Sequence, residues 1–125
     1  MSNFRLIFRA WNKKEQRMYS PEEVDNMNLF DLITDEDTWD IMQFTGIFDK
    51  TGDFIFEKDI VDFKIAAAPN NSQEVVFFSY DSGGFVKGGM QITSYLKTIK
   101  VIGNVFENPE MVTTRMKEQL EAVEL

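Results

Sequence analysis

The feature that most constrains the fold is a pair of apolar runs around a short polar loop. Residues 41–48 and 53–56 flank the loop 49–52, which ends in Gly52. A glycine that closes such a loop supplies the positive φ that a tight turn needs. We therefore predict an antiparallel hairpin here, and with it a fold in which strand pairing dominates.

Other segments repeat this strand signal through alternation of side chains or short apolar runs bounded by turn residues. We predict further strands at 4–11, 17–19, 61–65, 75–80, 85–87 and 99–106. The turn 81–84 joins two of them into a second hairpin, and the glycine pair at 88–89 marks a bulge or a turn.

The end of the chain changes to a helical period. Val112, Met116, Leu120 and Val123 fall on one stripe, which predicts an amphipathic helix over about 109–123. We expect Asn108 to cap it, with Pro109 and Glu110 in its first turn.

The region at about 20–40 is acidic and shows no clean period. Ser20, Pro21 and Glu23 have the order of a capping box with a proline at the first helical position, so a short helix can start there. We interpret the rest as a variable excursion on the fold.

Together these elements predict a mainly β chain, α+β by content. Its core is a small barrel-like or strongly bent antiparallel sheet, followed by a C-terminal amphipathic helix. A length of 125 residues with 43% apolar residues and 12 phenylalanines suits one packed domain over 1–125.

The net charge of −8 is unevenly distributed. Residues 1–20 carry five basic side chains and one acidic, whereas 22–62 carry thirteen acidic and two basic, a net charge of −11. A protein with this balance repels polyanions, which disfavours non-specific binding to nucleic acid or to anionic membranes.

The absence of cysteine excludes disulfides, thiolate metal sites and a cysteine nucleophile, and fits a reducing cytoplasm. The first residues have neither the apolar run of a signal peptide nor that of a membrane anchor. We therefore expect a cytoplasmic protein of a bacterial host with no membrane partner.

Three stretches resemble the YopX family. They are Phe-Arg-Ala-Trp-Asn at 8–12, Met-Gln-Phe-Thr-Gly-Ile-Phe-Asp-Lys-Thr-Gly-Asp-Phe-Ile-Phe-Glu-Lys-Asp-Ile-Val at 42–61, and Val-Ile-Gly-Asn-Val-Phe-Glu-Asn-Pro-Glu-Met at 101–111. Their order and spacing agree with the family over most of the chain.

The resemblance implies a mainly β fold with a barrel-like core and a protein encoded by phages or prophages. It implies no assigned biochemical activity. Members usually have glycine where this chain has Lys58, so we expect an altered backbone conformation at that position.

Acidic side chains are the first candidates for chemistry, since histidine and cysteine are both absent. Hard cations prefer oxygen ligands, and the acidic region supplies Asp31, Asp35, Glu36, Asp37 and Asp40. The spacing matches no EF-hand, so we favour a solvated loop and predict no metal and no cofactor. The pair Asp49 and Asp53 resembles part of a calcium loop, but a hairpin turn accounts for it.

Two further motifs invite a functional interpretation. Glu57 and Asp59 would face one side of a strand and share a proton or a metal, although a structural role in accepting backbone amides is favoured. The glycine-rich stretch 82–89 suits an anion, but it lacks the lysine ending and the following helix of a phosphate loop.

Basic and aromatic side chains near the start form the remaining candidate. A strand with cations beside an aromatic ring is typical of a platform for single-stranded nucleic acid. The residues are Arg5, Arg9, Trp11, Lys13, Lys14 and Arg17. We favour the alternative that Arg9 and Trp11 pair with the acidic segment 22–62 inside the fold.

These observations predict a non-enzymatic phage accessory protein that acts through contacts with a host or phage protein, or with itself as a homo-oligomer. The alternatives are a nucleic-acid-binding β-barrel that uses the basic strand, and an acidic mimic of DNA that occupies a host protein.

Overall fold

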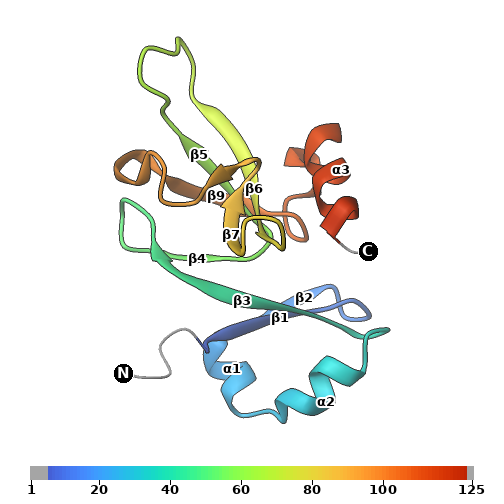
Figure 1. Ribbon diagram of the computed structural model, residues 1–125. Helices are drawn as coiled ribbons and strands as arrows, with labels where there is room; N and C mark the ends of the chain where they lie inside the picture. Colours follow the sequence, from blue (N-terminus) through green and yellow to red (C-terminus); the bar gives the residue numbers. More distant parts are fainter. Residues whose placement is uncertain (1–5, 124–125) are drawn as a thin grey trace.

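The strands form two antiparallel sheets that curl into a half-barrel (Figure 1). The computed structural model describes residues 6–123, with the side chain of Val123 outside the description. The first sheet has the order β2-β1-β3-β4, with β1 at Phe8–Asn12, β2 at Arg17–Tyr19, β3 at Trp39–Phe48 and β4 at Phe54–Phe56. The predicted fold class is confirmed.

The second sheet has the order β8-β7-β6-β5-β9. Its strands are β5 at Asp59–Phe63, β6 at Ser72–Ser79, β7 at Gly84–Lys87, β8 at Met90–Gln91 and β9 at Lys100–Asn104. A core of apolar side chains packs between this sheet and β4, among them Ile55 of β4, Phe63 and Ile99, each fully buried. The segments predicted as strands at 61–65 and 99–106 are strands, but β5 and β9 span 59–63 and 100–104.

The hairpin at 49–52 is confirmed. Gly52 has a φ of +86°, and the Asp49 amide donates to the Asp53 carbonyl at 2.8 Å. The buried Asp49 carboxylate accepts bonds from the amides of Thr51, Asp53 and Val101. Burial alone would raise the pKa of Asp49, but these hydrogen bonds outweigh it and lower that pKa. The carboxylate therefore holds the turn against β9.

The acidic region holds two helices, α1 at Pro21–Asp25 and α2 at Leu29–Thr34. The Ser20–Glu23 capping box is present, and Asn28 caps α2. At five and six residues, both helices are too short to reveal a helical period in the sequence. Val24 and Leu32 pack on one face of β1, where they meet Ala10.

The C-terminal helix begins later than predicted. A 3₁₀ turn, η2, spans Pro109–Met111, and α3 spans Thr114–Val123. Asn108 does not cap α3, because its side-chain oxygen accepts from the Asn104 amide; Thr113 accepts from the Met116 amide instead. Met116 is 2% exposed and packs against β5 and β6, which places α3 on the second sheet.

Lys58 occupies the corner between the two sheets. Its φ is +66°, so the left-handed conformation that suits glycine is kept although a lysine stands there, contrary to our expectation. Its amide donates to the Val76 carbonyl at 2.7 Å, and its carbonyl accepts from the Val105 amide at 3.0 Å. Its ammonium group pairs with Asp40 at 2.8 Å. The backbone bonds fix the conformation, and the ion pair gives the lysine a partner.

Substitutions at Lys58 should separate backbone strain from the ion pair. We expect Lys58→Ala to lower the free energy of unfolding by about 1 kcal/mol, because it loses the pair and keeps the strain. Lys58→Gly should be about 1 kcal/mol more stable than Lys58→Ala, because glycine adopts a positive φ without strain. Denaturant unfolding measures both values.

Lys64, which is not among the residues with positive φ, is the matched control. There glycine should be less stable than alanine. If glycine were also less stable than alanine at position 58, the backbone strain that we infer for Lys58 would be contradicted.

Candidate functional site

Arg9 is the charged side chain that joins the two sheets. It leaves β1 on the face opposite to Phe8 and Ala10, and its guanidinium group donates to Asp59 at 2.8 Å and to the Glu57 carbonyl at 3.2 Å. The side chains of Arg9 and Asp59 are 12% and 1% exposed. The pair therefore lies inside the protein, as predicted for Arg9 and the acidic segment.

The carboxylates of Glu57 and Asp59 are both used by the backbone. Asp59 accepts from the Phe56 amide at 2.7 Å, and Glu57 accepts from the Gln43 amide at 2.8 Å. Burial raises the pKa of Asp59 to about 6, although Arg9 and the Phe56 amide oppose the rise. Burial also raises the pKa of Glu57.

Glu57 lies in the turn before β5, whereas Asp59 begins that strand, so the two are not positions on one strand face as the sequence predicted. Their contacts support the structural interpretation that we favoured. They fix the turn between β4 and β5 rather than present a free carboxylate pair.

The basic residues near the start do not form one exposed face. Trp11 is inside the fold at 6% exposure, but its ring stacks on Phe106, which lies outside the acidic segment 22–62 where we predicted its partner, with ring centroids 5.3 Å apart. Arg17 pairs with Glu23 at the surface, and Lys13 donates to the Glu36 carbonyl at 2.7 Å.

Lys14 is exposed, and Arg5 lies outside the described residues. A stacking platform needs an accessible ring beside its cations. With Trp11 and Arg9 inside the fold, the described part of the strip lacks that ring.

Acidic side chains cover the α1–α2 region. Asp31, Asp35, Glu36 and Asp37 are exposed, while Asp40 is taken by Lys58. Among the residues that the structure describes, no group of three or more acidic, histidine or cysteine side chains is arranged to hold a metal ion. Four of the five candidate carboxylates therefore face solvent.

A groove of about 850 Å³ lies between α1 and β4. Its walls are mostly apolar, and two carboxylates stand on them, those of Glu22 and Asp25. The other lining residues are Leu6, Ile7, Phe8, Pro21, Val24, Met27, Leu29, Phe54 and Phe56. Its chemistry suits an apolar side chain flanked by a cation.

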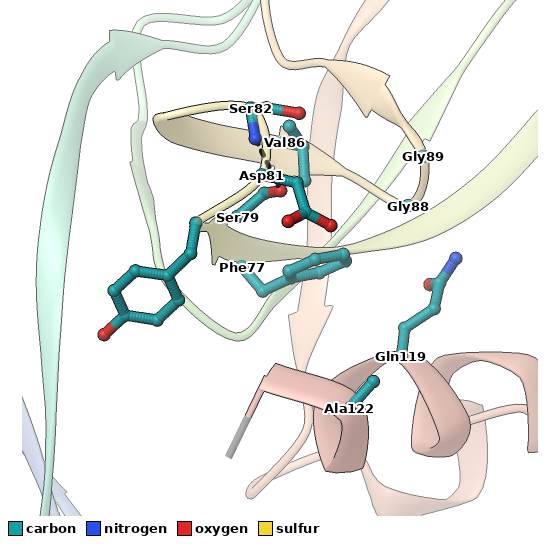
Figure 2. A pocket seen from close by; sticks show the side chains of 10 residues that line it. Phe77, Ser79, Asp81, Ser82, Val86, Gly88, Gly89, Gln119 and Ala122 are labelled. Atoms are coloured by element: carbon teal, nitrogen blue, oxygen red, sulfur yellow. Dashed lines mark hydrogen bonds between the residues drawn. The ribbon is translucent and has the colours of Figure 1, made fainter. Parts of the chain in front are cut away.

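A smaller pocket of about 350 Å³ lies between the β6–β7 hairpin and α3. Figure 2 shows the Asp81 carboxylate above the Phe77 ring and the Gln119 amide on the helix side. Gly88, with a φ of +59°, forms part of the wall. A Cβ there would stand 1.8 Å from a Glu74 carboxylate oxygen, so a larger residue would have to displace the Glu74 side chain.

The glycine-rich stretch 82–89 therefore lies beside carboxylates, which disfavours an anion. Sequence reasoning missed Glu74 and Gln119. The one signal for them was the glycine pair at 88–89, since glycine next to a strand often marks close approach of another group.

Comparison with known proteins decides the family. The profile described as YopX protein matches residues 7–113, most of the chain. This chain belongs to the YopX family. No curated protein matches it significantly.

Among solved structures, the YopX-family chain is similar to the crystal structure of protein EF1440 from Enterococcus faecalis. The two share 25% identity with a TM-score of 0.62, over 86% of this chain and 97% of the other. In the part of the YopX-family chain that the structure describes, no helix is long and apolar enough to cross a membrane.

Replacing Arg9 should show how much the buried pair of Arg9 and Asp59 contributes to the stability of this YopX-family chain. We expect Arg9→Met to lower the free energy of unfolding at pH 7 by about 3 kcal/mol, because Asp59 is left ionised and buried without its cation. Arg9 lowers the pKa of Asp59, so that pKa should lie above about 6 in Arg9→Met, and the deficit should shrink as the pH falls toward 6 and be smallest below it, where Asp59 is protonated in both proteins. Denaturant unfolding across a pH series measures this.

Arg17→Met is the control, since it breaks a surface pair and should leave stability nearly unchanged. A deficit in Arg9→Met that does not change with pH would contradict the role of Asp59.

Proposed function

We propose that this YopX-family protein is a non-enzymatic accessory protein of a phage or prophage that binds a basic, amphipathic segment of a partner protein at α1 and α2. The observation that carries the proposal is the exposure of two large apolar side chains on one short helix. Phe30 is 71% exposed and Ile33 is 52% exposed. They stand three residues apart, so they present one apolar face.

The groove beside α1 extends this apolar face. Leu29 lines the groove, and Ile33 lies one helical turn after it on α2. An amphipathic helix that lays its apolar face into such a groove is a common mode of peptide recognition. The walls supply apolar burial, which drives association.

The charge around these side chains selects the partner. Glu22 and Asp25 stand on the groove, and four more exposed carboxylates belong to α2 and the loop after it. A basic segment complements this surface, whereas a second copy of a chain with net charge −8 is repelled by it. We therefore assign the site to a basic partner rather than to self-association or to a polyanion.

The contacts of the buried charged side chains support a binding function over a catalytic one. Asp59 and Glu57 accept backbone amides, and Arg9 is held between them. A general acid or base needs a free atom within reach of a substrate. These groups instead hold the fold that presents α1 and α2.

The test uses Phe30→Ser with Ile33→Ser. We expect the wild-type chain to bind a model amphipathic helix that has leucines on one face and lysines on the other. Shifts of the Met27, Leu29 and Ile33 methyl signals in NMR detect this binding. The double variant should bind about tenfold or more weakly, since each lost apolar contact weakens binding by at least about 1 kcal/mol. Added salt should weaken the wild-type complex, because the rim is charged.

Tyr80→Ser is the matched control, since Tyr80 is 80% exposed and lies on the β6–β7 hairpin end instead. Equal binding by the double variant and the wild type would contradict the site. Light scattering measures the oligomeric state of the wild type and of the double variant. A homo-oligomer that the double variant dissociates would assign the surface to a second copy, and release of the helix by duplex DNA would favour mimicry of DNA.

A further inference from the structure

The pocket between the β6–β7 hairpin and α3 has one carboxylate on its wall, that of Asp81, beside an amide side chain and hydroxyl groups. Its walls come from the second sheet and α3, whereas α1 and α2 pack on the first sheet (Figure 1). No lysine or arginine lines it. The Asp81 carboxylate stands above the Phe77 ring, and among the described residues it forms no ion pair (Figure 2).

Two buried oxygens at this place have no hydrogen-bond partner. They are one carboxylate oxygen of Glu74 and the amide oxygen of Gln119. Glu74 is 8% exposed, so its carboxylate is held in the protein at an energetic cost. Buried polar atoms in native proteins are normally satisfied, and an exception calls for a ligand or a water.

Glu74 does not line the pocket but lies directly behind its wall at Gly88. A Cβ on Gly88 would fall 1.8 Å from the unpartnered oxygen, so no side chain separates that carboxylate from the pocket wall. The other oxygen of Glu74 already pairs with Arg115 of α3 at 3.2 Å. Glu74 therefore takes a guanidinium group at one oxygen and leaves the second without a partner.

We propose that this pocket binds an organic cation that carries a guanidinium or primary ammonium group. Both groups are donors without an acceptor, which complements the Asp81 carboxylate and the unpartnered oxygen of Gln119. The Phe77 ring adds an aromatic face of the kind that attracts cations. The volume of about 350 Å³ suits a small molecule or a single side chain.

Other ligand classes fit less well. The carboxylates repel a phosphate or a carboxylic acid. A hard metal ion needs several oxygens converging on one point, and no such group is present among the described residues. The inference is independent of the proposed function, because the two sites share no lining residue.

The experiment compares butylguanidinium with butylurea, its neutral counterpart of similar shape, on the full chain. We expect butylguanidinium to shift the Gln119 side-chain amide signals in NMR and to bind about tenfold or more tightly than butylurea, because charged hydrogen bonds are the stronger ones. Asp81→Asn should weaken butylguanidinium about tenfold and leave butylurea unchanged.

Glu118→Gln, an exposed change on the same helix, is the control and should bind as the wild type does. A short peptide with a central arginine, set against the same peptide with citrulline, tells a partner's side chain from a free small cation. Equal binding of butylguanidinium and butylurea, or no shift at millimolar concentrations, would overturn the proposal. So would full binding by Asp81→Asn. The methyl signals of Met27 and Leu29 should stay unchanged, which keeps this result separate from the test at α1 and α2.

Discussion

The buried pair of Arg9 and Asp59 is the interaction on which the rest of the structure depends. Arg9 belongs to the first sheet, and Asp59 begins the second. Because the carboxylate is almost completely buried, it needs the guanidinium group and the Phe56 amide to be tolerated there. The pair therefore holds β1 of the first sheet at one position against the start of β5 in the second sheet. The same contact removes Arg9 from the surface, where a nucleic-acid platform would need it.

A second polar link forms at the corner that Lys58 makes. The amide and carbonyl of Lys58 bond to Val76 and to Val105, so this one residue connects the turn after β4 with β6 and with the loop after β9. Its side chain reaches back to Asp40 on β3. A lysine can stand where glycine is usual, because tertiary bonds hold the left-handed backbone and the ammonium group gains a partner.

The two sheets carry different surfaces at their ends. The first sheet supports α1 and α2, whose exposed side chains are acidic and apolar together. The second supports α3 and the pocket that Asp81 and Gln119 line. Both surfaces carry carboxylates, which is the basis on which we propose a basic peptide for one and a small cationic group for the other. The net charge of −8 favours cationic ligands for the whole molecule as well.

The sequence by itself determined the local elements. The hairpin closed by Gly52, the capping box at Ser20 and the apolar stripe through Met116 depend on neighbours in the chain, and each is present. The start of α3 was misplaced because Asn108 is used by Asn104 instead. Only the tertiary structure decided that Arg9 meets Asp59, fifty residues away, and that Glu74 stands behind Gly88. Those contacts join side chains that the sequence separates, and no local pattern records which buried charges meet.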